Sequence, residues 1–284
     1  MIHFGDLPKQ YSEFETSKVA IVPVPYDGTS TWIKGADKGP KALLDASANM
    51  EIYDIETDSE VYKVGIYTDK PITEDSSPEA MVKAVKARTL SFIDKGKFTV
   101  IIGGEHSVSI GTIQAHAQKY QNLTVLQIDA HTDLRDSYEG SKNNHACVMA
   151  RAKELCPIVQ VGIRSMDSGE KVSLDPARVF WAHKIVNCDA WIDQAINLLT
   201  ENVYLTIDLD GFDPSILPST GTPEPGGLLW YPTLKFLRKV IEKRNLVGFD
   251  IVELCPNTDD KASDFLAAKL LYKILTYKFL NQIK

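Results

Sequence analysis

The stretch Leu123-Thr-Val-Leu-Gln-Ile-Asp-Ala-His-Thr-Asp133 decides the fold, because an apolar run passes directly into two carboxylates and an imidazole. The run Leu123–Ile128 has the length and composition of a strand that is buried on both faces. Such strands are typical of parallel sheets covered by helices on both sides. The polar residues after the run would then lie at the carboxyl edge of the sheet, where open parallel sheets bind ligands.

Similar apolar runs alternate with helical patterns along the whole chain, which indicates βαβ units and an α/β fold. Besides Leu123–Ile128, the predicted strands are Val19–Val24, Phe98–Ile102, Ile158–Ile163, Arg178–Trp181, Val203–Ile207 and Leu246–Ile251. The predicted helices are Pro78–Asp94, Ser107–Tyr120, His145–Leu155, Ala190–Thr200, Tyr231–Lys243 and Lys261–Leu280. A length of 284 residues without repeats or a linker predicts a single domain spanning residues 1–284.

Composition excludes several classes of protein. With 44% hydrophobic and 24% charged residues, the chain is typical of folded globular proteins and not of disordered or collagen-like ones. It lacks an apolar run of the roughly 18 residues that a membrane span needs, and its start does not resemble a signal peptide, so we expect a cytoplasmic protein. The formal charge of −7 argues against nucleic-acid and membrane partners and favours cationic ligands.

Two more predicted strands end in polar side chains. Val203–Ile207 continues into Asp208-Leu-Asp210, and Phe98–Ile102 continues into Gly-Gly-Glu-His106. Taken alone, each Asp or His fits a turn or the start of a helix. If three strands end in carboxylates and imidazoles at one edge of the sheet, the buried carboxylates repel one another. Bound cations would remove this repulsion. The pattern therefore predicts a metal centre.

These motifs, together with Pro25-Tyr-Asp-Gly-Thr-Ser30, Ser219-Thr-Gly-Thr-Pro-Glu-Pro-Gly-Gly227 and Gly248-Phe-Asp-Ile-Val-Glu253, resemble those of the ureohydrolases, the family of arginase, agmatinase and their relatives. The resemblance covers nearly the whole chain and is nearest to agmatinase. It implies a three-layer α/β/α fold with a central, mainly parallel sheet, and a homo-oligomer of three or six copies.

The resemblance also implies a ligand set for two Mn²⁺ ions. His106, Asp129, Asp133 and Asp208 would bind one ion, and Asp129, His131, Asp208 and Asp210 the other, with Asp129 and Asp208 shared. A set of four carboxylates and two imidazoles suits Mn²⁺ better than the thiolate-rich or three-ligand sites of zinc. The general order of metal affinities alone does not exclude Zn²⁺, Ni²⁺ or Co²⁺.

By the same resemblance, three residues would act on the substrate. Asp133 would orient a hydroxide that two metal ions generate from water and pass its proton to the leaving amine. Glu253 would hold the guanidinium group. His145 would transfer protons, a role that suits the pKa of histidine. Without the resemblance, Glu253 and His145 would be interpreted as an ordinary strand-end acid and a helix-start histidine. We expect His3, His116 and His183 to lie at the surface or in the core.

The reaction predicted from the resemblance is hydrolysis of agmatine to putrescine and urea. Aminopropylagmatine, guanidinobutyrate or arginine as substrate, a single-zinc deacetylase-like amidohydrolase, and a catalytically silent binding relative are the alternatives. The predicted centre keeps a net negative charge, which favours dicationic amines over arginine. In the loop that follows Asp133, we expect Asp136 and Glu139 to repel the α-carboxylate of arginine, unless Arg135 points inward and offsets this repulsion.

Two departures from the family pattern leave open questions. Glu105 stands before His106 where the family more often has Asp, which predicts a changed contact beside the metal centre and not a changed number of metal ions. The segment 32–41 carries Trp32 and several lysines where tyrosine and arginines are commoner, so substrate length or subunit contacts could differ from those of relatives.

Overall fold

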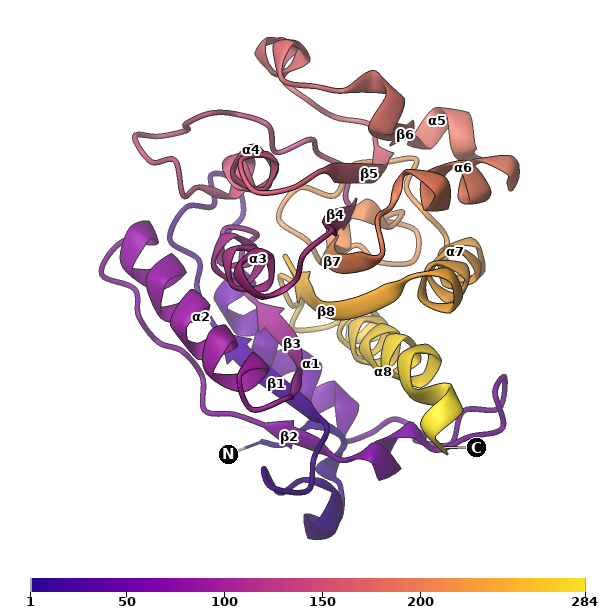
Figure 1. The fold of residues 1–284 in the computed structure, drawn as a ribbon. Helices are drawn as coiled ribbons and strands as arrows, with labels where there is room; N and C mark the ends of the chain where they lie inside the picture. Colours follow the sequence, from indigo (N-terminus) through magenta and orange to yellow (C-terminus); the bar gives the residue numbers. More distant parts are fainter. Residues whose placement is uncertain (1, 284) are drawn as a thin grey trace.

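The computed structural model describes residues 2–283. Its centre is an eight-stranded sheet of order β2-β1-β3-β8-β7-β4-β5-β6, in which all neighbouring strands are parallel (Figure 1). The strands are β1 Val19–Val24, β2 Ile66–Thr68, β3 Phe98–Gly103, β4 Leu123–Ile128, β5 Ile158–Ile163, β6 Val179–Trp181, β7 Asn202–Asp208 and β8 Asn245–Val252. The parallel sheet confirms the predicted α/β class.

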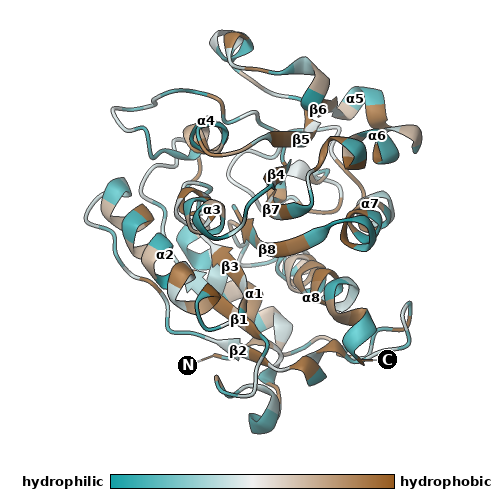
Figure 2. Ribbon diagram, viewed as in Figure 1, coloured by the Kyte–Doolittle hydropathy of each residue, from teal (hydrophilic) through white to brown (hydrophobic). Residues whose placement is uncertain are grey.

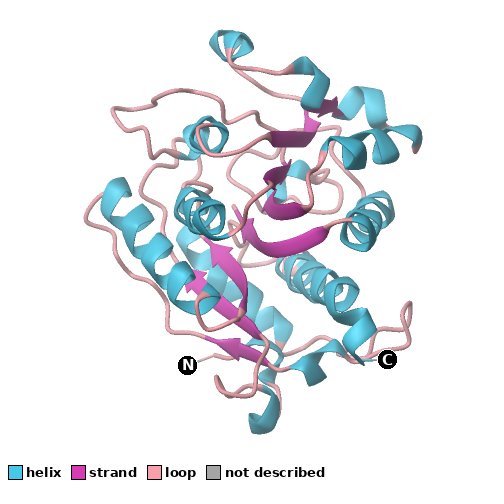
Figure 3. Ribbon diagram, viewed as in Figure 1, coloured by secondary structure: helices cyan, strands magenta, loops and turns pink. Residues whose placement is uncertain are grey.

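Helices cover both faces of this sheet (Figure 3). On one face lie α2 Pro78–Ile93, α3 Val108–Lys119 and α4 Val148–Lys153. The other face is covered by α1 Gly39–Ser47, α6 Ala190–Leu198, α7 Trp230–Lys243 and α8 Ala262–Ile283, and α5 Ala182–Ile185 lies beside β6. The fold is therefore the predicted three-layer α/β/α arrangement.

Two hydrophobic clusters fill the spaces between the layers. Because neighbouring residues of a strand point to opposite faces, Val19 and Ile21 join the cluster under α1, α7 and α8, whereas Ala20 and Val22 join the cluster under α2 and α3. The central strands are accordingly apolar throughout, and polar residues gather on the outer faces of the helices (Figure 2). This two-sided burial explains why the apolar runs predicted the strands so well.

Three elements were not predicted from the sequence. The strand β2 has three residues and lies at the edge of the sheet, the helix α1 begins with Gly39-Pro40, and α5 has four residues. The strand β2 and the helix α5 are too short to show a hydrophobic period, whereas α1 has nine residues and was missed although proline is typical of a first helical turn. The predicted helix His145–Leu155 begins instead as a 3₁₀ turn, His145–Cys147, before α4.

Within residues 2–283, no helix combines the length and the apolar character that a bilayer crossing requires.

Candidate metal centre and active site

Four neighbouring strands bring the predicted site residues together. In the sheet, β3, β8, β7 and β4 lie side by side with their carboxyl ends at one edge. His106 follows β3, Glu253 follows β8, Asp208 ends β7, and Asp129 follows β4. Residues that are more than a hundred positions apart in the sequence therefore meet at this edge, as the rule for parallel sheets predicts.

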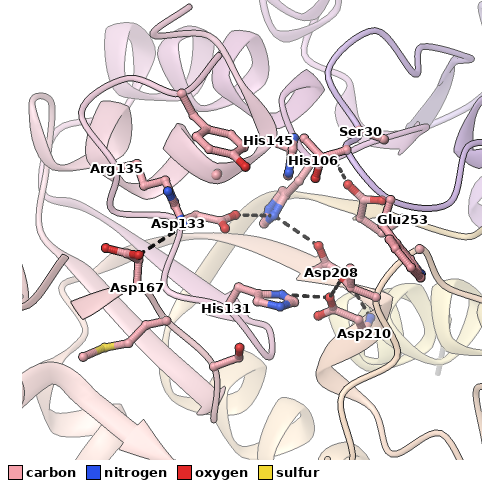
Figure 4. Close-up of a pocket in the computed structure, with 18 of the residues that line it drawn as sticks. Ser30, His106, His131, Asp133, Arg135, His145, Asp167, Asp208, Asp210 and Glu253 are labelled. Atoms are coloured by element: carbon pink, nitrogen blue, oxygen red, sulfur yellow. Dashed lines mark hydrogen bonds and ion pairs between the residues drawn. The ribbon is translucent and has the colours of Figure 1, made fainter. Parts of the chain in front are cut away.

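His106 lies at the centre of the first group. Its Nδ1 atom is 2.9 Å from Asp133 Oδ2 and 3.3 Å from Asp208 Oδ2 (Figure 4). The same atom is 3.2 Å from Asp129 Oδ2. The opposite ring nitrogen, Nε2, lies 2.9 Å from the Thr206 hydroxyl. In the described chain Nδ1 is buried without a hydrogen bond of acceptable geometry. A ring nitrogen aimed among three carboxylate oxygens is the arrangement of a metal ligand with an outer partner on its other nitrogen.

His131 and Asp210 form the second group with Asp129. His131 Nδ1 lies 2.9 Å from Asp210 Oδ2 (Figure 4) and 3.6 Å from Asp129 Oδ1. Each of the two groups, His106–Asp129–Asp208 and Asp129–His131–Asp210, offers ligand atoms close enough to hold one ion. Asp129 belongs to both groups, as expected for a shared ligand. A bridging role for Asp208 stays a prediction.

Hydrogen bonds fix the orientation of these carboxylates. Asp129 accepts the Gln127 side-chain amide at 2.6 Å and the His131 backbone N–H at 2.6 Å. Asp208 accepts the Asp210 N–H at 2.9 Å, and Asp210 accepts the Ala130 N–H at 3.1 Å. The second oxygens of Asp208 and Asp210 face His106 and His131, so these contacts orient the carboxylates toward the two histidines.

The buried acids crowd one another electrostatically. Burial and the neighbouring carboxylates raise the pKa of Asp208 and Glu253 well above the ordinary range, and burial together with Asp129 raises the pKa of Asp133 to about 7. Burial also opposes charge on Asp129, but His106 and His131 outweigh it and lower that pKa. The site thus holds more negative charge than its histidines neutralise, which is the condition that a bound cation relieves.

Asp133 and Glu253 adopt left-handed backbone conformations, with φ of 51° and 65°. Non-glycine residues rarely adopt this region, and such residues concentrate at functional sites. The turn at Glu253 directs its carboxylate toward β3, where Oε1 accepts the backbone N–H of His106 at 2.7 Å. Glu253 therefore touches the backbone of a candidate ligand while its side chain lines the cavity.

A cavity of about 360 Å³ opens above the centre. Its inner wall contains the candidate residues His106, His131, Asp133, Asp208, Asp210 and Glu253. His145 also lines it, and Arg135 and Asp167 lie farther from the candidate ligands (Figure 4). Trp32 is a further lining residue. All predicted catalytic residues and ligands border this cavity except Asp129, which is fully buried beneath it.

The loop after β4 differs from the prediction. Asp136 and Glu139 do not line the cavity, and the Asp136 carboxylate instead pairs with Lys142 at 3.2 Å and Arg151 at 2.8 Å. The expectation that these two acids repel a substrate carboxylate is therefore wrong. Arg135 lines the cavity, and its guanidinium lies 3.7 Å from the Asp167 carboxylate. This difference arises because the loop folds back onto α4.

Sequence reasoning missed several residues that hold the site. Thr206 contacts His106 and donates to Asp250 at 2.6 Å, and Glu170 accepts the Leu134 N–H at 2.8 Å beneath the loop after β4. Arg164 donates to the backbone carbonyls of Asp210 at 2.6 Å and Glu224 at 2.8 Å, which ties two site loops together. None of these residues has a local sequence signal, because each acts through contacts distant in the chain.

The sequence model of the Arginase family matches residues 17–276. The chain belongs to the arginase family. It is 40% identical to the N(1)-aminopropylagmatine ureohydrolase of Synechocystis over 96% of this chain and 95% of that protein. It is also 32% identical to the agmatinase of Pyrococcus horikoshii, over 90% of each chain.

Among solved structures, the agmatine ureohydrolase of Thermoplasma volcanium superposes with a TM-score of 0.88 at 28% identity, covering 99% of this chain and 96% of that one. These similarities confirm the predicted membership of the ureohydrolases near agmatinase. They also confirm the prediction of a hydrolase that acts on guanidino C–N bonds. The site of this arginase-family member contains the two candidate metal groups described above.

Proposed function

We propose that this arginase-family enzyme uses two Mn²⁺ ions to hydrolyse an aliphatic guanidino amine, with N(1)-aminopropylagmatine as the preferred substrate and agmatine as the shorter alternative. Hydrolysis would release urea and leave spermidine or putrescine, respectively, because water replaces the alkyl amine on the guanidino carbon. The observation that carries the proposal is the pair of buried carboxylate–histidine groups at the base of the cavity.

The side chains fit the proposed ions. The buried His106 Nδ1 lacks a hydrogen bond in the described chain and faces three carboxylates, which a cation at that position would satisfy. The ligands would be His106, Asp129, His131, Asp133, Asp208 and Asp210. Their carboxylate-rich composition favours Mn²⁺. When bound, the ions would supply an activated water near neutral pH.

The residues of the cavity would divide the remaining tasks. Glu253 would accept hydrogen bonds from the guanidinium and hold its carbon over the centre. Asp133, at the edge of the ligand set, would orient the attacking water through a carboxylate oxygen. His145, which lines the cavity, would pass a proton to the departing amine. Burial is the main cause that lowers the pKa of His145 to about 4, which favours the neutral ring.

The charges that line the outer cavity favour a substrate whose far end carries an amine over one whose far end carries a carboxylate. The centre and Glu253 together carry excess negative charge, which attracts polycations. Farther out, the Asp167 carboxylate is 51% exposed and neutralises Arg135, the cation that would otherwise favour a substrate carboxylate. The curated relative that acts on N(1)-aminopropylagmatine has 40% identity, against 32% for the agmatinase, which supports the longer amine.

The proposal keeps three expectations that came from the sequence: a homo-oligomer of three or six copies, no nucleic-acid or membrane partner, and a cytoplasmic location. The net charge of −7 supports the absence of polyanionic partners.

Urea release from a panel of guanidines tests the function directly. The Mn²⁺-loaded enzyme should be assayed with aminopropylagmatine, agmatine, 4-guanidinobutyrate and arginine under identical conditions. We expect the two amines to exceed the two carboxylates in kcat/KM by about a thousandfold, the discrimination expected when a carboxylate must be desolvated without a partner. A higher kcat/KM for arginine or guanidinobutyrate would contradict the proposal.

A further inference from the structure

Thr29 connects Glu105 and His145, which come from different parts of the chain. It follows β1 in the segment Pro25–Ser30, is 7% exposed, and has its hydroxyl between Glu105 and His145. The close approach of this segment to the residues after β3 depends on Gly104, where a Cβ atom would lie 2.0 Å from the Tyr26 carbonyl oxygen. The Glu105 N–H also bonds to this carbonyl, at 2.8 Å, which aligns the two segments.

The Thr29 hydroxyl makes three polar contacts. It donates to Glu105 Oε2, it accepts the backbone N–H of His145 at 3.0 Å, and it lies 3.2 Å from His145 Nδ1. The Glu105 carboxylate is fully buried and also accepts the Ser107 hydroxyl through Oε1. A hydroxyl has a single proton, so a Thr29 that donates to Glu105 has only lone pairs to offer to His145.

Burial raises the pKa of Glu105 to about 7, while the Ser107 and Thr29 hydroxyls favour its ionised form. With Glu105 ionised, the donation by Thr29 sets the tautomer of His145. A nitrogen that faces a lone pair must itself carry a proton, so Nδ1 is the protonated nitrogen of the neutral ring. The Nε2 atom, at the far edge of the ring, then has the free lone pair. Because His145 lines the cavity and Nδ1 is occupied by Thr29, Nε2 is the nitrogen available to substrate or water.

We propose that Thr29, held by Glu105, is a positioning residue that fixes the Nδ1-protonated tautomer of His145, so that Nε2 can accept and return a proton during urea formation. This inference rests on the proposed function, which assigns proton transfer to His145. It explains why a buried carboxylate occupies position 105 although it is not among the candidate metal ligands. Its role is to bind the Thr29 proton, not to contact the substrate.

The test uses the Mn²⁺-loaded enzyme with aminopropylagmatine and the variants Thr29→Val, Thr29→Ala, Thr29→Ser and His145→Ala. Thr29→Val and Thr29→Ala remove the hydroxyl, and we expect kcat to fall about tenfold with KM within about twofold, since a misplaced acid–base group affects the chemical step. Thr29→Ser keeps the hydroxyl and should keep kcat within about threefold of the wild type. Bound Mn²⁺ should stay unchanged in all four variants.

A double-mutant cycle separates positioning from general damage. If Thr29 acts through His145, the variant Thr29→Ala/His145→Ala should have the kcat of His145→Ala alone. The inference would be overturned if the kcat loss of the double variant equals the product of the two single losses. It would also be overturned if Thr29→Ala or His145→Ala has the kcat of the wild type. None of these results would contradict the ureohydrolase function. Failure of the wild type to release urea would instead overturn the proposed function.

Discussion

His131 Nδ1 lies 2.9 Å from Asp210 Oδ2, although the two residues follow different strands and are far apart in the sequence. The register of the sheet explains this contact, because Ile128 at the end of β4 pairs with Ile207 near the end of β7. The residues that leave the two strands therefore start side by side. The same register places Asp129 beside Asp208, so two adjacent parallel strands supply most of the candidate metal ligands.

Replacement of Asp208 by Asn should release most of the bound metal and abolish nearly all urea formation. Asp208 is 3.3 Å from His106 Nδ1, and we predict that it bridges both ions, so its loss should weaken both together. Metal analysis and urea release measure this directly. Asp136→Asn is the matched control, because its carboxylate pairs with Lys142 and Arg151 outside the cavity. A fully metallated, active Asp208→Asn enzyme would disprove the bridging role.

Replacement of Glu253 by Gln should lower activity while the metal stays bound, unlike the replacement of Asp208. Gln retains a carbonyl oxygen that can accept the His106 N–H, now 2.7 Å from Glu253 Oε1, so the metal content should stay near normal. The charge that orients the guanidinium is lost, and kcat/KM should fall about a hundredfold or more, equivalent to about 2.7 kcal/mol. If the variant loses metal as Asp208→Asn does, Glu253 belongs among the metal ligands.

The Arg135–Asp167 pair should control discrimination against carboxylate substrates. In Asp167→Asn the guanidinium of Arg135 loses its neutralising partner, at 3.7 Å, and becomes available to a substrate carboxylate. We expect the ratio of kcat/KM for agmatine over 4-guanidinobutyrate to fall about tenfold. Arg135→Gln should instead raise this ratio. Equal ratios in both variants and the wild type would show that the pair has no part in specificity.

Acid stability should depend on His116, which is buried in α3. Its Nδ1 lies 2.8 Å from the Thr112 carbonyl and its Nε2 3.0 Å from the Thr99 hydroxyl, and burial lowers its pKa from 6.5 to about 4. The unfolded chain gains this proton as the pH falls through 6.5, whereas the folded protein gains it only near pH 4. Stability from the neutral ring is therefore present above pH 6.5 and is lost between pH 6.5 and 4.

The variant His116→Gln should remove this pH-dependent contribution. From pH 7 to pH 5 its free energy of unfolding should decline by about 2 kcal/mol less than that of the wild type. Urea-induced unfolding of both proteins at the two pH values measures the difference, and effects of metal release cancel in the comparison. Parallel declines would show that His116 is not buried as a neutral ring.

The sequence predicted the central layer and the candidate site for one physical reason. Strands buried on both faces are continuous apolar runs, and a polar residue at the end of such a run, as in Ile128-Asp129, marks both the strand end and the site. The six candidate ligands all border or underlie the same cavity, as predicted. Their roles as ligands stay predictions until metal is measured.

Other features depend on contacts that no local pattern encodes. Thr29 belongs to a motif that the sequence analysis singled out, but its contacts with Glu105 and His145 arise only when β1 and β3 pair in register. The orientation of Asp136 away from the cavity depends on Arg151 in α4. Side-chain direction in a long loop is set by such distant partners, which explains why the expected repulsion by Asp136 and Glu139 was wrong.

The most direct test of the two-metal account is a titration of the metal-free enzyme with Mn²⁺ while urea release from aminopropylagmatine is measured. We predict that activity rises with occupancy and reaches its maximum at two ions per chain, because both carboxylate–histidine groups take part. Full activity with one ion per chain, or no urea release from either amine with two ions bound, would contradict the account.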